Sequence, residues 1–123
     1  MSYQRVVLKA FGGPENLELE ELKDLPEPAA GQLRVKVLTA GTGFTDTIIR
    51  QGQYVDVKDK PPFTPGYDWF GVVDKLGEGV TQFKVGQHVA DMPVIGGYTQ
   101  YLCADAEQMV PAPDGLDPTQ AVA

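Results

Sequence analysis

Short apolar runs, several of them alternating with polar residues, follow one another along the chain and are separated by glycine and proline. Alternation with a period of two residues predicts strands that bury one face. The clearest example is residues 33–38, with the sequence LRVKVL. We expect further strands at residues 5–10, 17–20, 71–76, 88–90, 98–104 and 109–111. About seven short strands joined by turns indicate a mainly β fold, either a partly open barrel or a sandwich.

One internal stretch has the signals of a short helix instead. Thr45 or Asp46 can cap the start of a helix over residues 47–51, because both side chains can accept a hydrogen bond from the first free amides. Gly52 can end it in a left-handed conformation. The polar, proline-bearing loop that follows, residues 54–65, is long enough to indicate a functional role.

The last residues carry the signals of a second helix. Asp117 can act as the N-cap, Pro118 suits the first helical position, and Gln120 can complete a capping box. This helix pattern continues to the last residue of the sequence. We therefore expect the parent chain to continue, and a frayed natural terminus is the alternative.

Composition narrows the function classes. The length of 123 residues indicates one domain, and the net charge of −7 disfavours a nucleic-acid partner, which would require a basic patch. No segment approaches about 18 consecutive apolar residues, so we expect no membrane span. The start lacks a signal peptide, and the single cysteine, Cys103, permits no internal disulfide. These features favour a cytoplasmic protein.

The motif that comes nearest to a dinucleotide site does not fit one. Residues 41–46, GTGFTD, imitate a G-x-G-x-x-G turn between a strand and a helix. The sixth position is Asp46, whose charge would repel a phosphate and whose side chain blocks close helix packing. We therefore expect no dinucleotide-phosphate site within this chain. His88 is the only histidine, and it is interpreted as a surface residue of a strand.

Three longer segments carry a family resemblance. They are GTGFTDTIIRQGQY at residues 41–54, PGYDWFGVV at 65–73 and LGEGVTQFKVGQHV at 76–89, supported by glycine turns at 12–15 and 96–98. Together they resemble the N-terminal GroES-like domain of medium-chain dehydrogenases/reductases, most of all the quinone oxidoreductases of the zeta-crystallin type. The resemblance spans nearly the whole chain. It implies that residues 1–123 form a GroES-like, partly open β-barrel with one or two short helices, followed in the parent by a C-terminal Rossmann domain that this chain lacks.

The resemblance also bears on metal binding. Zinc-dependent relatives place cysteine, histidine and glutamate at the positions that Gly43, Tyr67 and Asp68 occupy here. A catalytic zinc needs three protein ligands, and only Asp68 could ligate well. The four-cysteine lobe of those relatives is also missing. We therefore expect no zinc, and a site without a Lewis acid favours substrates that accept hydride readily, such as quinones or activated enones.

The cofactor that the resemblance implies is NADPH, bound mainly by the missing domain, with Tyr54 lining the cofactor cleft. Gly43, Thr45 and Tyr67 would line the substrate side. Thr45 either donates a hydrogen bond to a substrate oxygen or only caps the helix, and Tyr67 is either a hydroxyl facing the cleft or a packed aromatic ring. Gly43 and Ile48 depart from the asparagine and tyrosine of the family. No residue is identified as an acid or a base.

The sequence thus predicts the substrate-side domain of an NADPH-dependent oxidoreductase, inactive by itself, that acts on a small-molecule quinone or other activated carbonyl. The alternative is a stand-alone, non-enzymatic GroES-like binding or assembly module. The polar loop at residues 54–65 disfavours that alternative, because a co-chaperonin needs a mobile loop with an apolar tip. A domain separated from its partner exposes apolar surface, so we expect the chain to self-associate.

Overall fold

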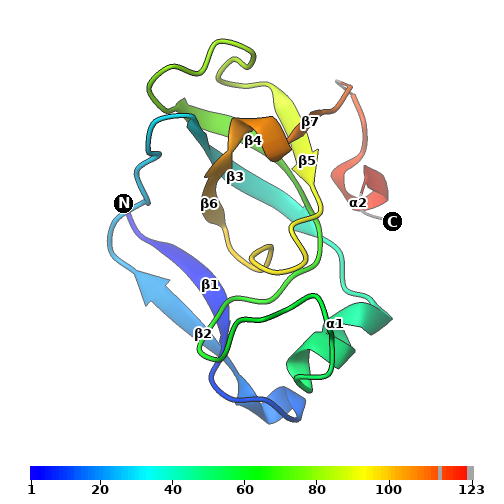
Figure 1. Cartoon of the computed structure of the whole chain (residues 1–123). Coiled ribbons are helices and arrows are strands. Elements are labelled where there is room, and N and C mark those ends of the chain that lie inside the picture. Colours follow the sequence, from blue (N-terminus) through cyan, green and yellow to red (C-terminus); the bar gives the residue numbers. More distant parts are fainter. Residues whose placement is uncertain (114, 122–123) are drawn as a thin grey trace.

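The main sheet has five antiparallel strands in the order β6-β3-β4-β5-β7, and a separate hairpin pairs β1 with β2 (Figure 1). The computed structural model describes residues 1–113 and 115–121, and the seven strands are counted within them. Their bounds are β1 (Tyr3–Leu8), β2 (Leu17–Leu22), β3 (Gln32–Ala40), β4 (Trp69–Leu76), β5 (His88–Asp91), β6 (Tyr101–Asp105) and β7 (Val110–Pro111). The two sheets do not close, and the prediction of a mainly β, partly open barrel is confirmed.

Two strand predictions need correction at their bounds. The first strand begins at Tyr3 and ends at Leu8, and the strand expected from residue 98 begins at Tyr101. The shift at residue 98 has a clear cause, because the amides of Gly97 and Tyr98 bond to the carbonyls of Gly66 and Pro65 rather than to a strand. Residues 97–98 therefore lie across the segment that precedes β4.

The hairpin strand β2 was expected to bury its leucines, and this expectation was wrong for Leu19, which is 63% exposed. Leu17 and Leu19 instead line an open groove with Val6 and Ala40, between the hairpin and the end of β3. The alternation of leucine with glutamate predicted the strand correctly. It did not predict that the apolar face of the hairpin would stay uncovered.

The core lies on one face of β3 and β4. Val35 of β3 and Trp69 and Val73 of β4 are at most 1% exposed, and Val89 of β5 joins them. Burying one such side chain contributes about 1.5–3 kcal/mol, so this cluster accounts for much of the folding free energy. Trp69 and Phe70 lie in the interior, each 1% exposed.

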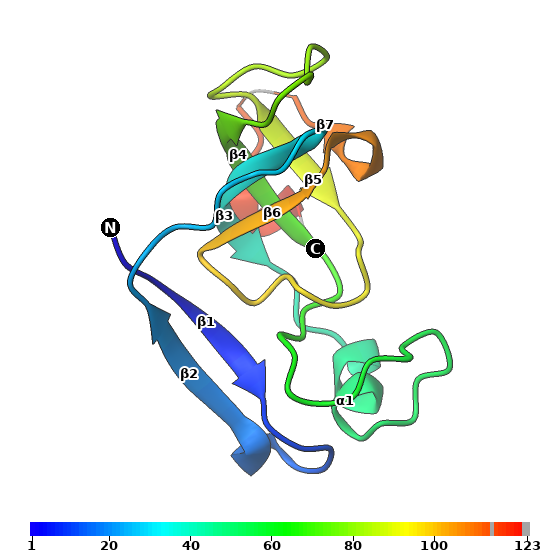
Figure 2. The ribbon, with the colours of Figure 1, turned by 60° about the vertical axis from the view of Figure 1, so that its left-hand side comes forward.

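Two β-bulges shape β3 and β4. The pairing jumps from Val37 opposite Gly71 to Thr39 opposite Phe70, so Leu38 is the extra residue on β3. A bulge bends the strand that carries it. This bend directs the end of β3 toward helix α1 (Phe44–Arg50), which lies beside the hairpin at one end of the sheet (Figure 2).

Helix α1 begins three residues earlier than expected, and its N-cap is Gly43, not Thr45 or Asp46. Glycine has no capping side chain, and the amide of Asp46 bonds instead to the carbonyl of Gly43 over 3.1 Å. Arg50, at the other end of the helix, donates from Nε to the carbonyl of Gly12 over 3.0 Å. The helix is thereby tied to the turn between β1 and β2.

The second helix, α2, spans Pro118–Ala121, and two 3-10 turns occupy Pro14–Asn16 and Ala106–Gln108. Asp117 caps α2, since its Oδ1 accepts from the amide of Thr119 over 2.9 Å. Residues 122–123, which the sequence assigned to the same helix, lie outside the described residues. No helix among residues 1–113 and 115–121 is long and apolar enough to cross a bilayer.

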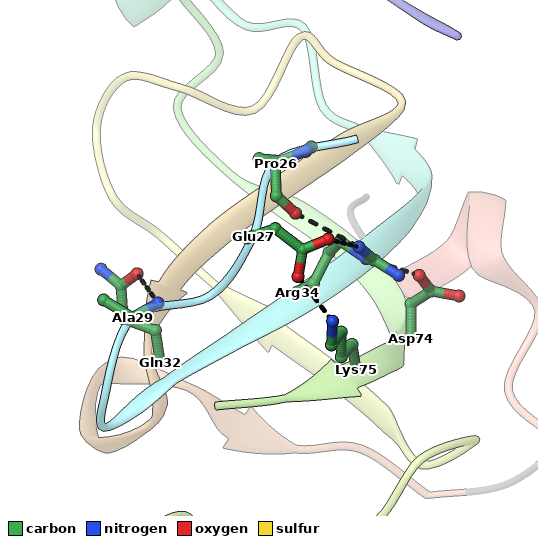
Figure 3. Close-up of polar contacts among 7 residues, drawn as sticks. All are labelled: Pro26, Glu27, Ala29, Gln32, Arg34, Asp74 and Lys75. Atoms are coloured by element: carbon green, nitrogen blue, oxygen red, sulfur yellow. Dashed lines mark hydrogen bonds and ion pairs between the residues drawn. The ribbon is translucent and has the colours of Figure 1, made fainter. Parts of the chain in front are cut away.

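A cluster of charges ties the loop before β3 onto the sheet (Figure 3). Arg34, whose side chain is 14% exposed, donates from Nε to Oδ2 of Asp74 over 2.7 Å and from Nη1 to the carbonyl of Pro26 over 3.3 Å. Glu27 contacts both Arg34 and Lys75, and its bond to Lys75 is the main reason that its pKa lies below the ordinary value. Arg34 is therefore the centre of the cluster.

We predict that Arg34→Met lowers the free energy of unfolding by about 1–2 kcal/mol, because Asp74 and the Pro26 carbonyl lose a charged donor while the aliphatic stem is kept. Urea denaturation measures this loss. The matched variant Lys75→Met removes an exposed partner of Glu27 and should cost less than about 0.5 kcal/mol. Equal losses in the two variants would contradict the central place of Arg34.

Candidate functional site

The end of β3, the start of α1 and the segment before β4 enclose a small cavity of about 150 Å³. The structure brings three of the four predicted site residues, Gly43, Thr45 and Tyr67, to this one cavity, although Tyr67 is distant from the other two in sequence. The full lining is Gly41, Thr42, Gly43, Thr45, Asp46, Tyr67 and Asp68. Tyr54, the fourth predicted residue, packs against Tyr67 at the edge of the cavity.

Asp46 holds the two sides of the cavity together. Its Oδ2 accepts from the amide of Gly43 over 2.9 Å, and its Oδ1 accepts from the amide of Tyr67 over 3.1 Å. Hydrogen bonds to an ionised acceptor are about twice as strong as neutral ones. From the sequence, Asp46 was expected only to repel a phosphate or to cap a helix. In the structure it also links α1 to the segment that precedes β4.

Tyr98 is the residue that the sequence analysis missed. Burial raises the pKa of its hydroxyl strongly, and the charge of Asp46 and hydrogen bonding to Asp46 raise this pKa further. The backbone beside it is fixed, since the Tyr98 amide donates to the carbonyl of Pro65 over 2.9 Å. No local signal in the sequence relates Tyr98 to Asp46, because this pairing exists only in the folded chain.

Asp68 fixes the turn at the end of β3. The amide of Gly41 donates both to Oδ1 of Asp68 over 3.1 Å and to its carbonyl over 3.3 Å. Gly43 offers no ligating atom. The Tyr67 phenol is not among the usual zinc ligands, and Asp68 already accepts an amide, so these three residues do not fit a catalytic zinc. Within the described ranges, no group of three or more His, Cys, Asp or Glu side chains could hold a metal.

Thr45 lines the cavity from the first turn of α1. The capping role that was its alternative is not realised, because Gly43 is the N-cap. In the described part of the chain, the Thr45 hydroxyl makes no hydrogen bond. This hydroxyl therefore remains free to meet a ligand.

Tyr67 combines the two roles that the sequence left open, since it lines the cavity and also packs against an aromatic ring. The rings of Tyr54 and Tyr67 meet edge to face, with centroids 6.4 Å apart and planes at 84°. Hydrogen bonding to Tyr67 is the main reason that the pKa of Tyr54 lies above its ordinary value, with burial next. A hydrogen bond raises the pKa of a phenol when that phenol is the donor. The two tyrosines therefore interact at the edge of the cavity.

A second cavity, of about 420 Å³, shares Asp68 with the first and extends toward α2. Its lining includes Asp91, whose Oδ1 accepts from the amide of Met92 over 2.8 Å. Among the described residues, the buried Oδ2 of Asp91 has no hydrogen-bond partner, and burial raises the pKa of this carboxyl. Sequence reasoning gave no sign of Asp91.

The loop after β5 is strained at Val94, which bonds to the segment before β4. Val94 has a φ of 77°, a conformation that is rare for a β-branched residue, and its amide donates to the carbonyl of Tyr67 over 3.0 Å. Strain of this kind costs about 1–3 kcal/mol and tends to occur at functional sites. The strained residue thus fixes the backbone of Tyr67 from the side opposite Asp46.

Comparison with known proteins places this geometry in context. The family model described as alcohol dehydrogenase GroES-like domain matches residues 29–114. A VAT-1 homolog-like protein of Mus musculus is 33% identical over 118 residues, which are 96% of this chain and 28% of that protein. A quinone oxidoreductase of Sus scrofa is 37% identical over 114 residues, covering 92% and 34%. The chain therefore spans about a third of the length of these relatives.

Solved structures of similar proteins have the same fold over nearly the whole chain. The human VAT-1 homolog-like protein superposes with a TM-score of 0.89 at 31% identity, over 99% of this chain and 39% of that one. A mycobacterial protein complexed with NADPH superposes with a TM-score of 0.82 at 29% identity, over 97% and 36%. Both similarities cover nearly all of the present chain.

The close approach at Gly66 generates a prediction. Gly66 has a φ of +119°, and a Cβ there would lie 2.6 Å from the amide nitrogen of Tyr98 and 2.7 Å from that of Gly97. We expect Gly66→Ala to lower the free energy of unfolding by at least about 3 kcal/mol, because backbone must be displaced. Gly79→Ala has a similar φ of +82° but open space around it, so it should cost only about 1–2 kcal/mol. Urea denaturation compares them, and equal costs would show that the close approach does not matter.

Proposed function

Because this chain belongs to the alcohol dehydrogenase GroES-like domain family, we propose that it is the substrate-side domain of a cytoplasmic oxidoreductase that transfers hydride from NADPH to a quinone or other activated carbonyl or enone. The observation that carries the proposal is the small cavity lined by Thr45 and Tyr67 without a metal-binding set. Such a cavity suits a polar oxygen of a substrate. The proposed activity belongs to the longer protein that carries this domain, and the isolated 123 residues are proposed to be inactive.

In this proposal the Thr45 hydroxyl donates a hydrogen bond to the substrate oxygen. It lines the cavity and makes no other hydrogen bond among the described residues. A donor placed where negative charge develops stabilises the transition state of a hydride transfer to a carbonyl or enone. Gly43 contributes space, since nothing lies within 4 Å of the position that a Cβ would take there.

Among the described residues, no set of side chains could ligate zinc, and this favours a substrate that accepts hydride without a Lewis acid. A quinone or a conjugated enone accepts hydride without a Lewis acid, because its electrons are delocalised onto oxygen as the carbon is attacked. An unactivated ketone or alcohol would need stronger polarisation, of the kind a bound metal supplies. The names of similar proteins support a quinone or an activated enone as the substrate, since they include quinone oxidoreductases and a 2-haloacrylate reductase.

A second, nucleotide-binding domain completes the proposed site. The relatives are about three times as long as this chain, and one similar structure contains NADPH. The residues of this chain fit only one wall of a dinucleotide site. The glycine-rich turn before α1 carries Asp46, whose carboxylate bonds to the amides of Gly43 and Tyr67 and would repel a phosphate. We propose that a C-terminal Rossmann domain holds the phosphates of the cofactor and that Tyr54 lines its cleft.

Exposed apolar side chains near the two cavities support such a partner. Phe44, which precedes Thr45, is 80% exposed, and Met92 and Val110 of the second cavity are 64% and 62% exposed. Exposed large apolar side chains can mark an interface when they lie together. In the proposal this surface meets the Rossmann domain, and in the isolated chain it promotes self-association.

The test is a steady-state assay of the native gene product that carries this sequence. We expect it to oxidise NADPH in the presence of a quinone or an activated enone, with an activity that survives exhaustive chelation. The isolated 123-residue chain, assayed beside it, should show no turnover. Activity that disappears on chelation and returns with zinc would contradict the proposal. A native product that is inactive and sediments as a ring would favour the non-enzymatic assembly module.

A further inference from the structure

Reduction of a quinone or enone requires a proton as well as a hydride, and few groups at the cavity can supply one. Its lining includes no histidine, cysteine or lysine. The two carboxylates act as acceptors, since Asp46 takes the amides of Gly43 and Tyr67 and Asp68 takes the amide of Gly41. The remaining proton donors are the hydroxyls of two threonines and of Tyr67.

The other titratable groups of interest lie elsewhere. His88 stacks on Phe70 with ring centroids 5.5 Å apart, and it belongs to β5 on the far side of β4 from β3. Cys103 belongs to the edge strand β6, and burial raises the pKa of its thiol, which makes it a poorer nucleophile and ligand. Neither residue lines the cavity.

We propose that Tyr67 is the catalytic residue that gives its proton to the substrate, and that Tyr54 is a positioning residue that orients the Tyr67 hydroxyl and returns the proton to it. This inference rests on the proposed function and adds the acid that the function requires. It follows from the place of Tyr67 in the cavity wall and from its edge-to-face contact with Tyr54.

Chemistry favours the phenol over the threonine hydroxyls. Tyrosine is an established general acid in enzymes, and its ordinary pKa of about 10 is far below that of an aliphatic alcohol. Thr45 has no hydrogen-bond partner among the described residues that could return a proton to it. Tyr67 has a second phenol beside it, since the ring of Tyr54 packs on it edge to face and the pKa of Tyr54 is raised chiefly by interaction with Tyr67. The threonine therefore binds the substrate oxygen, and the tyrosine transfers the proton.

The step balances in electrons and protons. When bound, NADPH would supply the hydride, which carries two electrons and one proton. The carbon of the conjugated C=C or C=O bond accepts the hydride as its π bond breaks, and the electron pair moves toward the substrate oxygen. The O–H bond of Tyr67 breaks as a new bond to hydrogen forms on the substrate. The Tyr67 phenolate then takes the proton of the Tyr54 hydroxyl, and Tyr54 regains a proton from solvent.

The surroundings of the pair are acidic. Asp46 faces Tyr67 from α1 and Asp68 follows it in sequence, while the charge of Asp56 contributes to raising the pKa of Tyr54. The interaction with Tyr67, burial and the charge of Asp56 all act to raise the pKa of Tyr54. The charge of Asp56 thus favours the neutral phenol of Tyr54.

The first experiment measures kcat and KM of the native gene product with a quinone or enone and NADPH. We expect Tyr67→Phe to lower kcat about 100-fold with KM changed less than about threefold, and Tyr54→Phe to lower kcat about tenfold with the same KM. Thr45→Val should mainly raise KM. The matched control Tyr101→Phe removes a hydroxyl from a buried ring that packs on Tyr3, and it should leave kcat unchanged.

A second readout needs no cofactor. In a ¹³C NMR titration of the 123-residue chain labelled at tyrosine Cζ, Tyr54 should titrate above its ordinary pKa in the wild type. Tyr67→Phe should bring this pKa down toward the ordinary value, because the acceptor of its hydrogen bond is removed, whereas Tyr101→Phe should leave it unchanged. An unchanged Tyr54 pKa in Tyr67→Phe would show that the two hydroxyls do not interact and would overturn the role of Tyr54.

The outcomes separate the inference from the proposed function. A wild-type gene product that reduces no quinone or enone refutes the proposed function itself. An active wild type whose Tyr67→Phe variant keeps its kcat refutes only Tyr67 as the acid. Loss of kcat in Thr45→Val with Tyr67→Phe unaffected would assign the proton to the threonine and also overturn the inference.

Discussion

The candidate site depends on one carboxylate, Asp46. It accepts the amide of Gly43 with one oxygen and the amide of Tyr67 with the other, and it also interacts with the hydroxyl of Tyr98. Three segments that are far apart in sequence are thereby fixed around the same small cavity. The amide of Tyr67 is partly buried, and a buried amide left without a partner costs about 1–3 kcal/mol, so Asp46 opposes opening of the site.

This arrangement explains how the described residues, among which no group of three metal-binding side chains occurs, present an ordered polar site. Asp46 and Asp68 hold backbone amides, so the negative charge near the substrate is already engaged with donors. The hydroxyls of Thr45 and Tyr67 remain at the cavity wall to address the ligand. Backbone contacts, including that of the strained Val94 to Tyr67, help to position this site.

The sequence predicted the parts of the fold that local patterns determine. The patterns at residues 33–38 and 71–76 located β3 and most of β4. The start of α1 was misplaced, because Gly43 can cap a helix only through backbone bonds that no side-chain pattern reveals. The exposed Leu19 was likewise invisible, since alternation shows which residues share a face and not whether another element covers it.

The site was predictable only in part, for a physical reason. The resemblance identified Gly43, Thr45, Tyr54 and Tyr67, and the fold brings them together. The roles of Tyr98 and Asp91 depend on burial and on partners distant in sequence, and neither quantity is encoded in a local spacing. The contact between Tyr54 and Tyr67 is likewise a property of the folded chain alone.

Amide hydrogen exchange at Gly43 and Tyr67 tests the central claim most directly. An asparagine at position 46 has only one acceptor oxygen and cannot hold both amides. We expect both amides to be protected in the wild-type chain and at least one to exchange about tenfold faster or more in Asp46→Asn, with Asp56→Asn unchanged. Exchange rates at both positions that are the same in the wild type and in Asp46→Asn would contradict the account.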